Sequence, residues 1–270
     1  MLTVFAAAAL AAASPQALPA ENSDPAIFLV HDADTTVYIF GTFHALDGKS
    51  DWFNDGVRAA FEQSDELVLE TLVPEGPARV PAPNPGLRVG YAQPFGAVTP
   101  SASFLATTRM AIDAGRAQGM NVGNGADMVL RRAAELEGKQ VEGLETLESQ
   151  LAMFTRMPAT ARTEPPRPGT RVETAAPMAS LSKAMAEMQA AWKQGDQSVF
   201  VRMLGQLERA SPDTYRIMFT ERNARWADWI AGRMQTPGVV FVAVGAGHLA
   251  GKDSLLVRLA QLGIPSARVN

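Results

Sequence analysis

The chain has 270 residues, of which 47% are hydrophobic, and this composition allows a sizeable core in one large domain. Its formal net charge of −4 provides no overall positive field, so we do not expect a nucleic-acid partner. The absence of cysteine excludes disulfides, thiolate zinc sites and cysteine nucleophiles. A metal ion would have to be bound by carboxylates and by the three histidines.

The N-terminal segment is predicted to be a signal peptide over residues 1–20. Val4–Ala13 is a short apolar run, followed by prolines and small residues, although no Lys or Arg precedes it. A membrane span needs roughly 18 or more apolar residues, so no stable span is expected in the mature chain. We predict an exported protein, periplasmic or secreted, with one domain over residues 21–270.

The first elements after this segment are expected to be β-strands. Ala26–Val30 and Thr36–Phe40 are apolar or β-branched runs around the polar turn His31–Asp34, a pattern that predicts a hairpin. Helical spacing over Asp51–Gln63 and a short apolar run at Glu66–Glu70 follow. A βαβ unit is the simplest interpretation.

Proline-rich loops at 73–100 and 158–177 interrupt the remainder. Helical patterns and short strand patterns lie around them, and residues 178–234 are predicted to be a helical insertion. The expected helices are Ser101–Gln118, Asp127–Glu137, Thr146–Met157, Met178–Trp192, Asp196–Arg209, Ser211–Met234 and Asp253–Gln261, and the expected strands are Lys139–Leu144, Val239–Val244 and Ser266–Val269. The fold class is therefore α/β, with a central mixed β-sheet flanked by helices.

Two predicted strands end in the same short motif. Gly41-Thr42-Phe43-His44 follows the second hairpin strand, and Gly245-Ala246-Gly247-His248 follows the apolar strand Val239–Val244. The C-terminal edge of an open α/β sheet is where ligands bind, so both histidines are site candidates if the strands share a sheet.

Several known motifs are excluded at these positions. Gly245–Ala250 matches the G-x-G-x-x-G/A dinucleotide pattern, but no later strand with an acidic residue follows it. Gly251-Lys252 lacks the other residues of a phosphate loop, and the chain contains neither G-x-S-x-G nor H-E-x-x-H.

His44, His248 and Glu70 are the predicted metal ligands. Two neutral imidazoles and a carboxylate suit a divalent ion (Mn, Co or Zn) that keeps open positions for water. Such an ion acidifies its bound water and polarises a carbonyl, which supports hydrolysis. The alternative is that each histidine caps a strand end through backbone hydrogen bonds.

Other candidates carry two interpretations each. Arg222 could bind a substrate carboxylate or stabilise an oxyanion, with Asn223 donating beside it, or it could form an ion pair on a helix surface. Glu145 could be a general base or a carboxylate favoured by a helix N-terminus. For His31 a solvated turn is favoured over metal binding. The methionines of the first inserted helix, Met178, Met185 and Met188, indicate core packing more than an adaptable binding groove.

The paired motifs resemble the Gly-x-x-His motifs of the TraB/GumN (Tiki-like) family. Further matches are Leu67–Glu70, Val141–Thr146 with Gln150, Trp192 with Gly195-Asp196, and Arg222-Asn223 before Trp226. The resemblance implies an α/β fold related to the haem-binding ChaN-like and erythromycin-esterase-like group. For Tiki members it implies proteolysis dependent on manganese or cobalt, with His44, His248 and a glutamate at the site.

The predicted function is an exported metal-dependent hydrolase, protease- or peptidase-like, acting on a peptide or a small molecule. The alternative is a binding or signalling protein that sequesters haem or a peptide in the same pocket without turnover. The two differ in whether a substrate is consumed. The substrate, the metal and the oligomeric state do not follow from the sequence.

Overall fold

A computed structural model describes residues 21–72, 110, 112–157 and 175–269. The predicted signal peptide and the loop at 73–100 lie outside these residues. So do most of the predicted helix Ser101–Gln118, of which 112–117 are helical, and most of the loop at 158–177. Residues 175–177 begin helix α5, so the loop prediction is wrong there.

The centre of the molecule is a mixed six-stranded sheet in the order β6-β5-β7-β3-β2-β8. β6, β5, β7 and β3 run parallel to one another, whereas β2 is antiparallel to both β3 and β8. The strands are β2 (Ile27–His31), β3 (Thr35–Thr42), β5 (Glu66–Thr71), β6 (Gln140–Glu145), β7 (Gly238–Gly245) and β8 (Ala267–Arg268). A separate pair joins β1 (Glu21–Asn22) to β4 (Ser50–Asp51).

The hairpin β2–β3 and the later strand positions agree with the sequence prediction. β7 inserts between β3 and β5, so the predicted βαβ unit has parallel strands that are not neighbours. Because β7 is the parallel neighbour of β3, the two Gly-x-x-His motifs lie next to each other at the same edge of the sheet.

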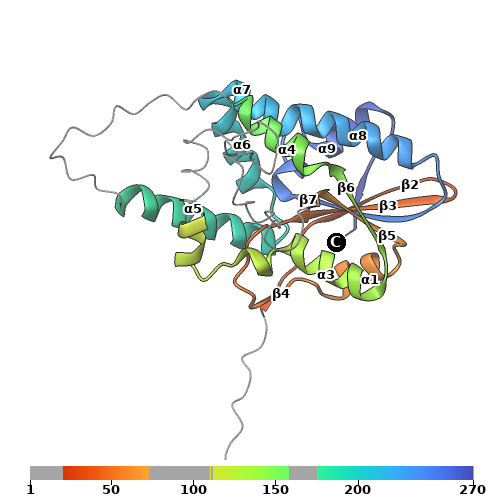
Figure 1. Ribbon diagram of the computed structural model, residues 1–270, viewed down its shortest axis with the longest axis horizontal. Helices are drawn as coiled ribbons and strands as arrows, with labels where there is room; N and C mark the ends of the chain where they lie inside the picture. Colours follow the sequence, from red (N-terminus) through yellow and green to blue (C-terminus); the bar gives the residue numbers. More distant parts are fainter. Residues whose placement is uncertain (1–20, 73–109, 111, 158–174, 270) are drawn as a thin grey trace, which may run out of the picture.

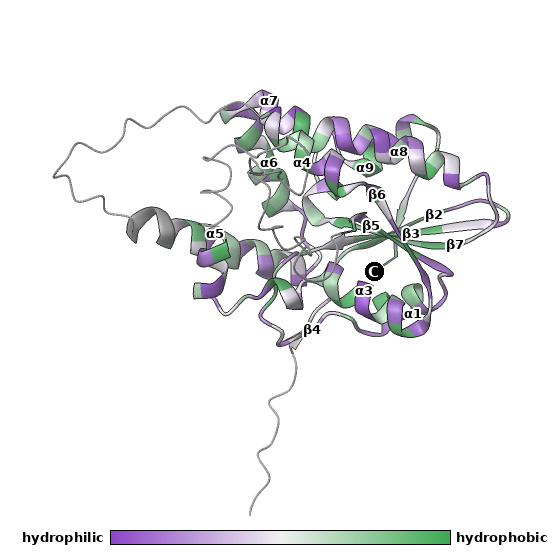
Figure 2. Cartoon of the chain, viewed as in Figure 1, coloured by the Kyte–Doolittle hydropathy of each residue, from purple (hydrophilic) through white to green (hydrophobic). Residues whose placement is uncertain are grey.

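Helices cover both faces of the sheet (Figure 1), which explains why β7 is apolar throughout. Phe241 and Ala243 of β7 belong to the core under α1 (Asp55–Glu62) and α3 (Ala126–Glu137). Val242 and Val244 belong to the core under α8 (Glu221–Arg233) and α9 (Leu255–Gln261). Figure 2 shows apolar strands between helices whose outer faces are polar. The α/β fold class is thus confirmed.

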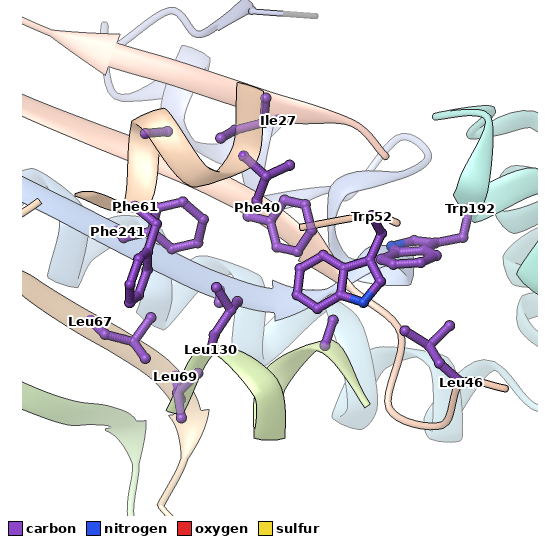
Figure 3. Close-up of a cluster of buried hydrophobic side chains, with 14 of the residues drawn as sticks. Ile27, Phe40, Leu46, Trp52, Phe61, Leu67, Leu69, Leu130, Trp192 and Phe241 are labelled. Carbon is purple, nitrogen blue, oxygen red and sulfur yellow. The ribbon is translucent and has the colours of Figure 1, made fainter. Parts of the chain in front are cut away.

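Aromatic side chains pack where β3 ends (Figure 3). Phe40 stacks on Trp52 with ring centroids 5.6 Å apart, and Trp192 meets Trp52 edge-on at 5.8 Å. The indole N–H of Trp192 donates to the carbonyl of Gly41 at 2.6 Å. Helix α5 (Ala175–Lys193) is therefore anchored beside the first Gly-x-x-His motif.

The inserted helices follow one another as predicted, with one difference. α6 spans Ser198–Ala210, and the predicted helix Ser211–Met234 is divided into α7 (Pro212–Tyr215), a π-helical turn at Arg216–Thr220, and α8. A π turn is typical of functional positions in helices. The remaining elements are α4 (Leu147–Thr155) and the short 3₁₀ helices Val122–Asn124 and Ala246–Leu249.

Candidate functional site

The ends of three parallel strands bring the predicted site residues together. Thr42 of β3 is paired with Gly245 of β7, and β5 lies on the other side of β7. His44 therefore follows β3 at the point where β7 ends, and Glu70 comes from the end of β5. Residues separated by about 200 positions in sequence meet because their strands share this edge.

Gly245 is the position at which these side chains converge. Its N–H donates to Glu70 Oε1 at 2.5 Å. A Cβ atom on residue 245 would lie 3.0 Å from Glu70 Oε1, 3.3 Å from His44 Nε2 and 3.7 Å from His248 Cδ2. Both histidines and the glutamate therefore surround one point, as the paired motifs predict.

Replacing Gly245 with alanine is expected to damage the site more than the fold. The backbone angles of Gly245, φ −55° and ψ 136°, suit alanine, so no backbone strain arises. The added methyl group would press on Glu70 and His44, and we expect any activity to fall about 100-fold, as for misplaced catalytic groups.

Gly232 provides the matched control for this variant. A Cβ at this α8 position meets no atom within 4 Å, so Gly232→Ala should stabilise the helix by up to about 1 kcal/mol and leave activity intact. Thermal unfolding and steady-state rates of both variants check this. Equal activity in the two would contradict the role of Gly245.

Arg222 is the charged centre of the site and is only 4% exposed. Its Nε donates to both carboxylate oxygens of Glu145, at 3.1 and 3.0 Å, and its Nη2 donates to Glu70 Oε2 at 2.9 Å. Nη1 lies 3.2 Å from His248 Nε2, and the guanidinium stacks 4.5 Å from the ring centroid of Trp226. One guanidinium thus joins β5, β6 and the second Gly-x-x-His motif.

These contacts exclude one of the sequence-based interpretations of Arg222 and leave its role toward a substrate as a prediction. The surface ion pair is wrong, because the side chain is buried between two carboxylates. Glu145 is also buried and accepts a further bond from Arg225 Nη2 at 3.0 Å. In this arrangement Glu145 holds Arg222, and the general-base interpretation of Glu145 has no support from its contacts.

His248 is held in one tautomer by Asn223. The Asn223 side-chain amide donates through Nδ2 to the carbonyl of Asp253 at 2.7 Å, so its oxygen faces His248 Nδ1 at 2.6 Å. His248 Nδ1 must carry the proton, and Nε2 accepts from Arg222. The predicted donor role of Asn223 toward substrate is therefore wrong, because both of its polar atoms are engaged inside the protein.

We expect Asn223→Ala to release this tautomer. The variant leaves the buried His248 N–H without its acceptor, which costs about 1–3 kcal/mol of unfolding free energy. Imidazole ¹⁵N shifts should show Nδ1–H for His248 in the wild type and a mixture in the variant. Asp253→Ala is the control, since it keeps the carbonyl that orients Asn223; an unchanged spectrum in Asn223→Ala would contradict the assignment.

His44 differs from His248 in being exposed, with 58% of its side-chain surface accessible. Its Nδ1 lies 3.4 Å from Asp127 Oδ1 at the start of α3. The backbone explains this approach: Ala126 N–H donates to the carbonyl of Phe43 at 2.9 Å, and a Cβ on Gly125 would lie 2.3 Å from the His44 carbonyl oxygen. Only glycine lets α3 begin so close to the motif.

The pKa values of the three groups diverge. Burial alone would raise the pKa of Glu70, but His248, Arg222, His44 and the Gly245 N–H lower it to about 2. Burial, together with Arg222, lowers the pKa of His248 to about 3. Desolvation would lower the pKa of His44, yet Asp127 and Glu70 raise it to about 9. At neutral pH the site therefore holds an ionised Glu70, a neutral His248 and a His44 that is mostly protonated and loses its proton as the pH rises toward 9.

These groups form the polar end of a cavity of about 590 Å³. Most of its other walls are methionine and phenylalanine side chains, together with Ile112 and Val122. Thr42 also lines it, and the buried Thr42 hydroxyl has no hydrogen-bond partner among the described residues. The cavity therefore combines apolar walls with a few converging polar groups, as ligand sites do.

The family comparison covers nearly all of the chain described above. The model of the TraB/PrgY/gumN family matches residues 26–82 and 88–267. The chain belongs to this family. The paired motifs on which the resemblance rested are thus part of a TraB/PrgY/gumN fold. No curated protein and no solved structure matches the chain in these comparisons.

The donor atoms of the predicted metal ligands Glu70 and His248 are already engaged in this TraB/PrgY/gumN chain. Within residues 21–72, 112–157 and 175–269, no three histidine or carboxylate side chains are grouped as a metal site requires. Glu70 accepts hydrogen bonds from Gly245 N–H and from Arg222, and His248 Nε2 also faces Arg222. The guanidinium of Arg222 therefore occupies the position next to these ligands that a metal cation would need. The residues do not fit a three-ligand site unless Arg222 moves, so a divalent ion stays a prediction.

One residue of the site, Asp127, could not be predicted from the sequence. Asp127 lies in the first turn of α3, 83 residues after His44 in the chain, and nothing in its sequence context indicates the contact with His44.

His31 is the last residue of β2 and does not lie in the turn. It is exposed and lies at the opposite end of the hairpin from His44. Met188 packs against the core, as predicted, and Met185 lines the cavity, so a binding groove at this helix stays a prediction. The side chain of Met178 lies outside the described residues.

Proposed function

We propose that this TraB/PrgY/gumN protein is a hydrolase of ester or amide bonds in which His44 activates water. The observation that carries the proposal is the convergence of His44, Glu70 and Arg222 at the polar end of the cavity. His44 pairs with Asp127 through Nδ1, while its Nε2 faces the site. This is the arrangement of a general base that is oriented by a carboxylate.

The reaction follows from these groups. Unprotonated His44 Nε2 takes a proton from water, and the oxygen of that water attacks the carbonyl carbon. Arg222 lines the cavity and stabilises the charge that develops on the carbonyl oxygen. The Thr42 hydroxyl supplies a further donor. His44 then returns the proton to the leaving alcohol or amine as the C–O or C–N bond breaks.

Arg222 supplies the positive charge in this proposal. The predicted metal-dependent, peptidase-like reaction is the competing form, and it requires that Arg222 leave His248 Nε2. Elemental analysis of the purified protein and titration with Mn²⁺, Co²⁺ and Zn²⁺ separate the two. We expect activity to persist after chelation; strict dependence on added metal would favour the sequence-based prediction.

A binding protein without turnover is the second candidate, and the apolar walls of the cavity favour it. A panel of p-nitrophenyl esters and aminoacyl p-nitroanilides tests both. Hydrolysis by the wild type that is lost in Glu70→Gln supports the hydrolase, because Glu70 carries the charge that holds Arg222. Ligand binding without any hydrolysis would support the second candidate.

Export remains part of the proposal. Among the described residues, no helix combines the length and the apolar character that crossing a bilayer requires. Fractionation of cells that produce the full chain, compared with a version lacking residues 1–20, tests the predicted signal peptide. Retention of the full chain in the cytoplasm would contradict export.

A further inference from the structure

We infer that the cavity accepts an unbranched acyl chain, so that the substrate is an acyl ester or acyl amide with its carbonyl at His44. This inference deepens the proposed hydrolase and rests on it for the reaction, but not for binding. The inference is based on the apolar side chains that line the cavity away from His44, Glu70 and Arg222.

Among the described residues, four methionines line the cavity, and they come from different parts of the chain. Met120 follows the helical residues 112–117, Met185 lies on α5, Met203 lies on α6, and Met218 lies in the π turn before α8. Methionine is unbranched and flexible, so such walls adapt to chains of different length and shape. Met185, Met203 and Met218 are each only partly buried.

Exposed apolar side chains also gather here. Ile112 and Val122 are 37% and 50% exposed, and both line the cavity. Apolar walls of a cavity that is open to water are a surface on which an apolar ligand can be buried. Phe43, which precedes His44 in the chain, and Phe200 line the same cavity. Apolar side chains and His44 therefore share one cavity.

The polar groups of the walls argue for an acyl chain and against an extended peptide. A bound peptide places an amide N–H and C=O at every residue, and each needs a partner when buried. Among the other polar lining residues that the structure describes, the Asn121 side-chain oxygen already accepts from Gly123 N–H, and Arg116 is exposed and lies 3.9 Å from Asp113. Among the described lining residues, the Thr42 hydroxyl is a buried polar group without a partner, and it lies with His44 at the polar end, where a single carbonyl group would use it. The rest of the ligand should therefore be hydrocarbon.

Hydrolysis of p-nitrophenyl esters with acyl chains of increasing length tests this inference. We expect kcat/KM for p-nitrophenyl esters to rise from acetate to dodecanoate by up to about fourfold per buried methylene, until the cavity is filled. Met185→Gln should flatten the series, because it places an amide in the wall. Met110→Gln is the matched control: Met110 is exposed and lies outside the cavity lining. Thermal unfolding verifies that both variants fold.

Binding of dodecanoate, measured by calorimetry, separates the inference from the proposed function. Dodecanoate binding that Met185→Gln weakens, without hydrolysis of any ester, would support the acyl cavity while the hydrolase fails. A flat ester series with clear turnover would overturn the acyl cavity and leave the hydrolase standing. Preferential binding of a capped leucine tripeptide over dodecanoate would also overturn it.

Discussion

Arg222→Met is expected to lower the free energy of unfolding by about 3–5 kcal/mol and to abolish activity. The substitution keeps an apolar stem of similar length but removes the cation from between Glu70 and Glu145. Breaking a buried charge pair leaves the remaining charge without compensation, which is the costly case for buried ion pairs. Denaturant unfolding measures the loss.

The pH dependence of this loss has a definite sign. The pKa of Glu70 is lowered to about 2 from 4.5 in the folded wild type, so its stabilising contribution is present above about pH 4.5 and disappears as the pH falls toward 2. Without Arg222, one of the groups that lower the pKa of Glu70 is lost, so this pKa rises and protonation in acid relieves part of the penalty. The stability difference between wild type and variant should therefore be largest at neutral pH and narrow in acid.

Arg225→Met is the matched control for this prediction. Arg225 contacts the same Glu145 but is 56% exposed, and exposed pairs contribute about 0–1 kcal/mol. We expect Arg225→Met to unfold nearly as the wild type does. A similar loss in both variants, or a loss below about 1 kcal/mol in Arg222→Met, would show that Arg222 is not the charged centre.

His44→Gln is expected to lower kcat by about 100- to 10,000-fold, the range for loss of a general base. The fold should survive, because the side chain is exposed and glutamine can still hydrogen-bond near Asp127. Steady-state hydrolysis and thermal unfolding are the measurements. KM should change little if His44 acts on water and not on substrate binding.

His31→Gln is the control of the same residue type. His31 is exposed at the end of β2 and pairs with Thr36 across the hairpin, away from the cavity lining. Its variant should retain wild-type rates. Activity that survives in His44→Gln, or falls equally in His31→Gln, would place the proton transfer elsewhere.

The strands and their shared edge could be predicted from local pattern. The run Val239–Val244 is apolar on both faces because helices cover both sides of β7. The hairpin of β2 and β3 is indicated by two apolar or β-branched runs around a polar turn. The two Gly-x-x-His motifs then meet because their strands are parallel neighbours. Hydrophobic periodicity and the positions of the motifs are thus sufficient to predict the strands and the edge at which the site lies.

The arrangement of the charged groups could not be predicted in the same way. A sequence shows that Glu70 and Glu145 end strands, but it does not show that Arg222 reaches both from one helix. The side chain of Asn223 faces inward because of its position on α8, and Asp127 reaches His44 because α3 begins at Gly125. Such contacts depend on the direction of side chains in three dimensions.

The pH dependence of kcat/KM for ester hydrolysis by metal-depleted protein tests the central claim most directly. His44 acts only when it is unprotonated, and its pKa is raised to about 9, while Glu70 and His248, with pKa values of about 2 and 3, do not titrate near neutrality. We therefore predict that kcat/KM rises with pH between about 6 and 9 and then levels. A profile that is flat or falls over this range would contradict the account.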